Sequence, residues 1–113
     1  MTPSPEYLAM LSIAGTGATV RAIRNIVCAH YGVTSIELES ATRSKNISLA
    51  RHVAMLMLRE GTTLSLPEVA RLLKRTDHTT VMWGIEKAQR VVRDETLDHL
   101  RSLVVSELMR VAA

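Results

Sequence analysis

The sequence predicts an all-helical bundle that contains a helix-turn-helix unit and ends in a long C-terminal helix. The first reason is size, because 113 residues suffice for one hydrophobic core but not for two domains of ordinary size. The second is composition: the chain has no Phe, and only Tyr7, Tyr31 and Trp83 are aromatic. Its core must therefore consist of aliphatic residues and Met, which pack readily between helices. The third is periodicity, because apolar residues recur every three or four positions through most of the chain.

Residues 1–17 are predicted to form an N-terminal arm, and residues 18–113 the main domain. The arm is expected to hold a short helix near residues 6–11 and to end at the flexible Gly15-Thr16-Gly17. In the domain, Thr19 is expected to cap a first helix that ends at Gly32.

The middle of the domain is predicted to hold two further helices separated by a loop. Ser35 can cap a short helical turn that ends at Glu39, and residues 41–46 have no apolar period, which indicates a loop. Ser48 is expected to open a helix that ends at Gly61, because the apolar residues between them share one face.

The helix-turn-helix unit follows. Ser65-x-x-Glu68 is a capping box with Pro67 in the first turn, and it predicts the start of a short helix. The period breaks at Lys74-Arg75-Thr76, and Asp77 is expected to cap the second helix, whose buried side comprises Val81, Ile85, Ala88 and Val92. Leu97, Leu100, Val104, Leu108 and Val111 then predict a last helix that packs back on the domain.

Composition restricts the kinds of protein that the chain can be. The single Cys28 cannot form an internal disulfide, and no apolar run reaches the ~18 residues that a membrane helix needs. The first residues lack the basic and apolar regions of a secretory signal. We therefore expect a cytoplasmic protein with no membrane partner.

The positive charge is concentrated in the middle of the chain. The net charge is only +3, and residues 1–42 and 85–113 are each close to neutral. The excess lies in residues 43–84, whose basic side chains are Arg43, Lys45, Arg51, Arg59, Arg71, Lys74 and Arg75. A basic middle on a neutral scaffold favours binding to a phosphate backbone, although such a run is also compatible with a solvated face.

The first turn of the second helix carries side chains that can read DNA. In a helix-turn-helix protein this turn enters the major groove first. Asp can accept from a base amino group, His can donate to or accept from a purine, and Thr offers a hydroxyl and a methyl group. We therefore expect base contacts from Asp77, His78, Thr79 and Thr80, and backbone contacts from the neighbouring basic residues Arg71, Lys74 and Arg75.

Three motifs resemble one known family. Arg51-His52-x-Ala54-Met55, Ser65-Leu66-Pro67-Glu68 and Asp77-His78-Thr79-Thr80-Val81 are similar to the C-terminal DNA-binding domain of the bacterial replication initiator DnaA. The resemblance covers about residues 18–110, and the order and spacing of the last two motifs make it specific. It implies a Trp repressor-like or DnaA domain IV-like helix bundle.

The resemblance also implies roles for individual residues. Asp77 to Thr80 would read a short asymmetric box in the major groove, and Arg43 would enter the adjacent minor groove. Positions that hold the phosphate backbone or flank the groove would be Lys45, Arg51, His52, Arg59, Thr62, Leu66 and Pro67.

The chain also departs from the family pattern. Lys74-Arg75-Thr76 stands where the family has Gly-Gly-Arg, and Leu49-Ala50 stands where it has Arg-Pro. One base-proximal arginine is therefore missing, so the preferred box is expected to differ. The chain has no counterpart of the family's ATPase module. We expect a nucleoid-associated, free-standing domain that acts in replication initiation as a regulator, a competitor at initiator boxes or part of a split initiator.

No catalytic, metal or cofactor site is expected. Asp77 and His78 are adjacent at a helix start and do not face one another, and the other His residues lack ligand spacing. Trp83, although able to stack on a base, is expected to pack against the arm or the last helix, and Met55, Met57 and Met82 to fill the core. The alternatives are a helix-turn-helix transcriptional regulator and an interaction module for replication proteins, as a monomer or a weak dimer.

Overall fold

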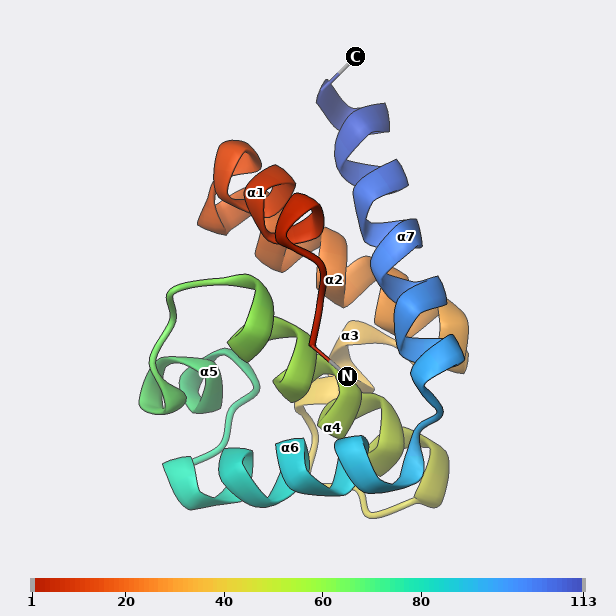
Figure 1. The fold of residues 1–113 in the computed structure, drawn as a ribbon. Helices are drawn as coiled ribbons and strands as arrows, with labels where there is room; N and C mark the ends of the chain where they lie inside the picture. The colour runs from red at the N-terminus through yellow and green to blue at the C-terminus, as the bar shows by residue number, and fades with distance from the viewer. Residues whose placement is uncertain (1, 113) are drawn as a thin grey trace.

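The chain folds as a bundle of seven helices, with no strand in the part of the chain that the structure describes. The computed structural model describes residues 2–112 (Figure 1). The helices are α1 (Pro5–Ala14), α2 (Thr16–Tyr31), α3 (Ser35–Glu39), α4 (Lys45–Gly61), α5 (Leu66–Leu72), α6 (His78–Val91) and α7 (Asp94–Ala112). This confirms the predicted fold class, with α5 and α6 as the helix-turn-helix pair.

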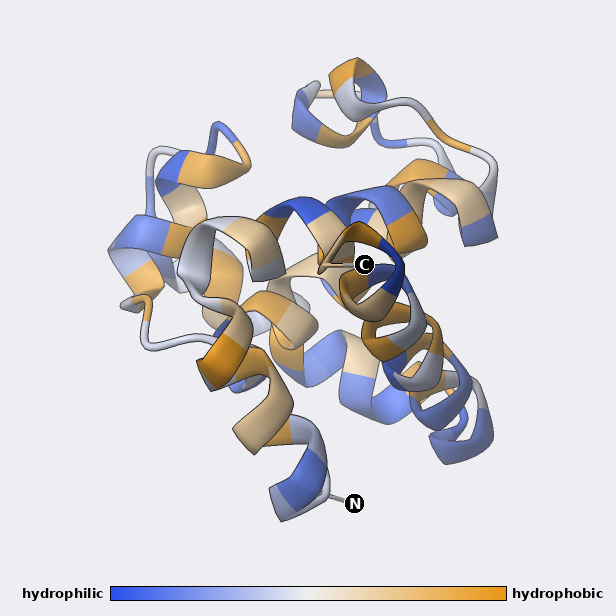
Figure 2. Cartoon of the chain, turned by 90° about the horizontal axis from the view of Figure 1, so that it is seen from above, coloured by the Kyte–Doolittle hydropathy of each residue, from blue (hydrophilic) through white to orange (hydrophobic). Residues whose placement is uncertain are grey.

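The central helix α4 organises the core. Nearly every residue from Ala50 to Leu58 is buried in it, and α2, α3, α5 and α6 all pack around it. Apolar and polar residues alternate in bands along the surrounding helices, as amphipathic helices require (Figure 2). Met55 and Met57 are fully buried, which confirms their predicted core role.

The last helix packs back on the bundle as predicted. Leu97, Leu100, Val104 and Leu108 are buried, whereas Val111 is 63% exposed and does not belong to the buried face. The buried guanidinium of Arg101 donates from Nε and Nη2 to the two carboxylate oxygens of Glu60, at 2.8 and 2.9 Å, and this pair fixes α7 to α4.

Three predicted helix starts are wrong. Ser35 does not cap α3; the N-cap is Thr34, whose hydroxyl accepts a hydrogen bond from the Glu37 backbone N–H at 3.0 Å. Thr19 does not cap α2, which begins at Thr16 after Gly15; Thr19 is instead buried, and its hydroxyl donates to the Leu11 carbonyl at 3.2 Å. The predicted loop over 41–46 is too long, because Ser44 caps α4 and the helix begins at Lys45. Lys45, Asn46 and Ser48 of this first turn are polar and only Ile47 is apolar, so the sequence shows no apolar period there.

The N-terminal helix α1 lies against the bundle. Tyr7 and Leu11 of α1 are buried. Leu11 packs against Gly61 at the end of α4, where an added Cβ would stand only 2.7 Å from Leu11 Cδ1. Because that contact leaves no room for a side chain, Gly61 lets the end of α4 and α1 approach closely.

Candidate nucleic-acid interface

Four of the five residues predicted to contact bases, Asp77 to Thr80, lie together at the start of α6, whereas Arg43 lies in the loop before α4. Asp77 is the N-cap, as predicted, and its Oδ1 accepts a hydrogen bond from the Thr79 backbone N–H at 3.0 Å. That hydrogen bond holds the pKa of the Asp77 carboxyl below its usual range. His78, Thr79 and Thr80 are all exposed and follow directly in the first turn. Asp77 Oδ1 also lies 3.7 Å from His78 Nδ1, so these two side chains approach one another, and the expectation that they do not face one another is wrong.

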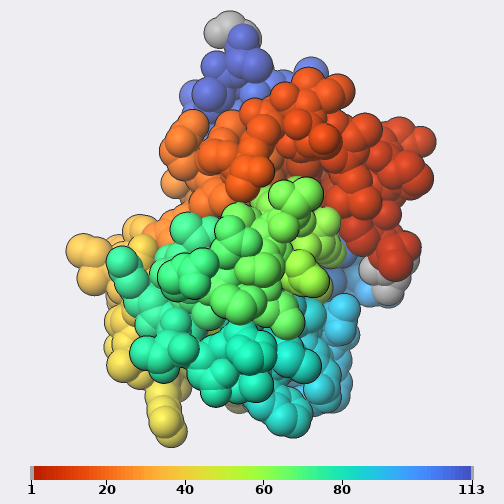
Figure 3. All heavy atoms as spheres, turned by 90° about the vertical axis from the view of Figure 1, so that its left-hand side faces the viewer, coloured from red at the N-terminus to blue at the C-terminus, as the bar shows by residue number. Residues whose placement is uncertain are grey.

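Exposed basic residues lie at the same end of the molecule as α6 (Figure 1). Figures 1 and 3 place α6 and the segment around residue 40, drawn in yellow, at the same lower end of the molecule. That segment carries the exposed side chains of Arg43 and Lys45, and Lys74 is exposed in the turn before α6. Arg75 links the two segments, since its Nη2 donates to the Ser40 carbonyl at 2.6 Å. The fold therefore brings the base-reading residues and several cations to one end.

Close packing at Gly84 fixes the rotation of α6 on α4. A Cβ at Gly84 would stand 2.3 Å from Met55 Sδ and 3.0 Å from His52 Cδ2, so only glycine permits this approach. Val81 and Ala88 are fully buried on the same side. Thr79 consequently lies on the opposite, outward side of α6, and His78 and Thr80 lie at the flanks of the buried face.

His52 lies half-buried at the α4–α6 contact and not on an open surface. Burial lowers the pKa of its imidazole, and the nearby charges of Lys87 and Arg51 lower it further. The folded protein therefore holds His52 neutral at a pH where the unfolded chain, with a His pKa of about 6.5, already binds a proton.

Lowering the pH from 7 to 5 should therefore reduce stability through His52. The contribution is fully present above about pH 6.5 and is lost as the pH falls toward the lower pKa of the folded state, because the unfolded state binds more protons in that window. Urea unfolding at both pH values should show a larger loss for the wild type than for His52→Gln. Equal losses in the two proteins would contradict this role.

Arg51 is buried, with only 5% of its surface exposed. Its Nε donates to the Leu38 carbonyl at 2.9 Å, and Nη2 donates to the Ser40 carbonyl at 2.8 Å, with longer bonds to the carbonyls of Glu37 and Thr42 at 3.3 Å. These acceptors end α3 and begin the following loop, where the helix dipole favours a cation. The guanidinium thus serves the fold, which changes the expectation that Arg51 contacts phosphates.

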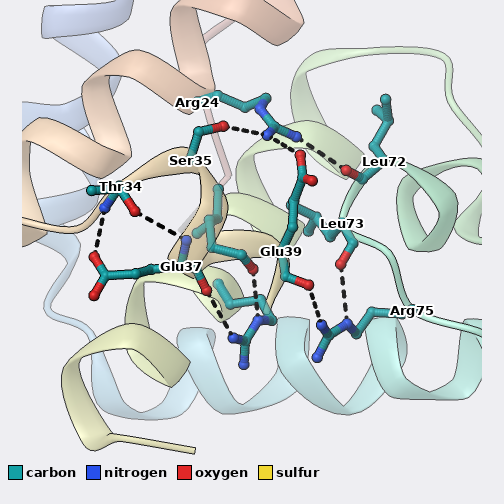
Figure 4. A network of polar contacts seen from close by, with 10 residues as sticks. Arg24, Thr34, Ser35, Glu37, Glu39, Leu72, Leu73 and Arg75 are labelled. Atoms are coloured by element: carbon teal, nitrogen blue, oxygen red, sulfur yellow. Dashed lines mark hydrogen bonds and ion pairs between the residues drawn. The ribbon is translucent and has the colours of Figure 1, made fainter. Parts of the chain in front are cut away.

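Arg75 and Arg24 continue this network between α3 and the helix-turn-helix turn (Figure 4). Arg75 donates to the carbonyls of Leu73, Glu39 and Ser40 at 2.6–3.0 Å. Arg24 forms an ion pair with Glu39 and donates to the Leu72 carbonyl at 3.0 Å. Arg75 is therefore engaged within the protein and is not a free phosphate ligand, and Arg24 is a structural residue that sequence reasoning did not find.

The turn between α5 and α6 places Lys74 in a left-handed conformation, with φ of 58°. The backbone N–H of Arg75 donates to the Ala70 carbonyl and that of Lys74 to the Arg71 carbonyl, at 2.8 and 3.1 Å. This is the Schellman pattern, in which glycine is the favoured residue at the left-handed position. This chain has lysine at that position, so its Cβ adds strain to the turn.

Lys74→Gly should raise the free energy of unfolding by about 1 kcal/mol, because glycine relieves the left-handed strain. Lys74→Ala is the matched control, since it removes the same charge but keeps Cβ and should give no such gain. Chemical denaturation of both variants measures the difference. Equal stability of the glycine and alanine variants would contradict the assignment of strain.

The remaining predicted contacts lie around the loop between α4 and α5. Arg59 is exposed, and its Nη1 donates to the Leu64 carbonyl at 2.7 Å. The Thr62 hydroxyl donates to the Leu58 carbonyl and accepts from the Leu64 N–H, so it shapes the loop. Leu66 is partly exposed and Pro67 exposed at the start of α5, where Ser65 and Glu68 form the predicted capping box.

Two predictions about apolar residues of α6 are wrong. Trp83 is 69% exposed and does not pack against α1 or α7, and Met82 is 51% exposed and does not fill the core. The cause is the helix rotation set at Gly84, which buries Val81 and Ala88 and leaves both side chains outside. Helical spacing indicates this arrangement, because residues 82 and 83 do not fall on the apolar face of α6 that begins at Val81.

Residues 2–112 contain no cluster of three or more His, Cys, Asp and Glu side chains arranged to hold a metal ion. Within the same residues, none of the helices combines the length and apolar character needed to cross a membrane.

The fold and the site together define a helix-turn-helix protein whose second helix presents an exposed polar first turn. The family described as the bacterial DnaA protein helix-turn-helix matches residues 20–88, and the chain belongs to this family.

Curated relatives agree with the family match. The chromosomal replication initiator protein DnaA of Chloroflexus aggregans is 41% identical over 88 residues, which cover 78% of this chain and 18% of that protein. The DnaA of Roseiflexus castenholzii is 42% identical over 95 residues, 83% of this chain and 20% of the relative. The DnaA of Thermomicrobium roseum is 34% identical over 115 residues, which cover 94% of this chain and 24% of the relative. The chain thus spans about a fifth of the length of these relatives.

Proposed function

We propose that this protein binds double-stranded DNA sequence-specifically, at sites similar to DnaA boxes, in replication initiation or its regulation. The observation that carries the proposal is the exposed first turn of α6, where His78, Thr79 and Thr80 project from a helix-turn-helix unit beside exposed cations. The names of the relatives, which are replication initiators, support the biological setting. The protein acts by binding, without turnover of a substrate.

The structure supports a shorter set of contacts than the resemblance implied. In this proposal His78, Thr79, Thr80 and Asp77 read base edges in the major groove, and Arg43 enters the minor groove. Phosphates are held by exposed side chains of α4, of α5 and of the turn before α6, which are Lys45, Arg59, Arg71 and Lys74, with Leu66 and Pro67 flanking the groove. Arg51, Arg75, His52 and Thr62 are left out because they are buried or engaged within the fold.

Selection of bound sites from a random duplex library tests the proposal. We expect one enriched box, with an affinity that falls by orders of magnitude as the salt concentration rises severalfold, because each phosphate contact releases counterions. The preference for the box over random duplex should persist at each salt concentration at which binding is measured. Binding without sequence preference, or binding that salt does not weaken, would overturn the proposal.

A further inference from the structure

Trp83 is the single tryptophan of the chain and lies 69% exposed on α6. Trp is usually well buried on average, and an indole exposed to this extent is a large apolar surface without a protein partner. The packing of α6 keeps it outside, because Gly84 leaves no space for the helix to rotate against Met55 and His52. Its exposure is therefore built into the α4–α6 contact.

Trp83 follows Thr79, a residue proposed to read bases, by one turn of α6. Thr79 and Trp83 are four residues apart, so they share the outward side of α6, about one turn or ~5.4 Å apart along the axis. Both lie opposite Val81, Gly84 and Ala88, which are buried. When the first turn of α6 enters the major groove, Trp83 is the next side chain on the same side.

The side chains around Trp83 on the outward side of α6 are polar or charged. Glu86 follows on this side and forms an exposed ion pair with Arg90, with an N–O distance of 3.3 Å. Trp83 therefore lies between the polar Thr79 and an ion pair, as an apolar side chain on an otherwise polar surface.

We propose that Trp83 is a further specificity-determining residue, whose indole packs against the 5-methyl group of a thymine next to the base pair that Thr79 contacts. The reason is chemical, because the thymine methyl is the apolar group that base edges present in the major groove. This inference rests on the proposed DNA binding and adds to it an apolar contact that reads sequence.

The test replaces each thymine of the selected box in turn by uracil, which removes only the methyl group. For the wild type, one replacement should weaken binding about three- to tenfold, as expected for the loss of one well-buried methyl contact. Trp83→Gln should bind the unmodified box more weakly by a similar factor and should be insensitive to that replacement. Trp83→Phe should retain part of the sensitivity. Met82→Gln is the matched control, since Met82 is exposed but lies about a quarter-turn around the helix.

Tryptophan fluorescence gives a second readout in the unmodified protein, because Trp83 is its only source. Binding to the box should change the emission and protect the indole from acrylamide, and binding to random duplex should do so less. Sequence-specific binding with unchanged fluorescence, or with equal uracil effects in wild type and Trp83→Gln, would overturn the role of Trp83 and leave the proposed function standing. Absence of any sequence preference in all variants would overturn both.

Discussion

Replacing Arg51 by Met should lower the free energy of unfolding by about 2–4 kcal/mol. The substitution keeps most of the buried stem but removes donors to the carbonyls of Leu38 and Ser40, among others, at the end of α3. Acceptors left without a partner cost about 1–3 kcal/mol each when they are buried, and hydrogen bonds from a charged donor are stronger than neutral ones. Urea or thermal unfolding of the purified variant measures the loss.

Arg59→Met is the matched control for this prediction. Arg59 is exposed and makes one backbone contact, with the Leu64 carbonyl, so its loss should cost less than about 1 kcal/mol of stability. For DNA binding we expect the opposite order, with a larger effect of the Arg59 substitution than of the Arg51 substitution. Arg59→Met should reduce the dependence of log affinity on log salt concentration by about one phosphate contact, whereas Arg51→Met, measured where it is folded, should not. An Arg51→Met protein that is fully stable but has lost a salt-dependent contact would contradict its structural role.

The features that sequence predicted well depend on neighbouring residues. The Ser65 capping box appears as predicted because its hydrogen bonds join residues three apart, and Asp77 caps α6 for a similar reason. The location of His78, Thr79 and Thr80 at an exposed helix start follows from the same cap. The helix-turn-helix unit and the exposed first turn were therefore predictable.

The features that sequence did not predict depend on contacts between distant segments. Arg51 has the sequence surroundings of a surface cation, and only the approach of α3, more than ten residues earlier, supplies its carbonyl partners. Trp83 is large and apolar, which favoured a buried position, although the helical spacing from Val81 leaves it off the buried face; the close contact of Gly84 with Met55 keeps it outside. A charge count over residues 43–84 treats Arg51, Arg75 and Arg59 alike. In the fold, Arg51 is buried and Arg75 donates to three backbone carbonyls, whereas Arg59 is exposed and donates to one.

Replacing His78 or Thr79 by Ala should weaken binding to the selected box by about 1–3 kcal/mol each and change binding to random duplex little. Both side chains are exposed in the first turn of α6, so their removal leaves the core intact. Competition assays with the box and with a scrambled duplex measure the two affinities at one salt concentration.

The stability of these variants separates a lost contact from a lost fold. The Asp77 cap bonds the backbone N–H of Thr79, which remains in Thr79→Ala, so the helix start should persist and unfolding should change by less than about 0.5 kcal/mol. Asp77→Ala behaves differently, because it removes the cap and should lower stability by about 1 kcal/mol together with any base contact. If His78→Ala and Thr79→Ala weakened box and scrambled DNA equally, these residues would hold phosphates, and sequence preference would have to arise elsewhere on α6 or at Arg43.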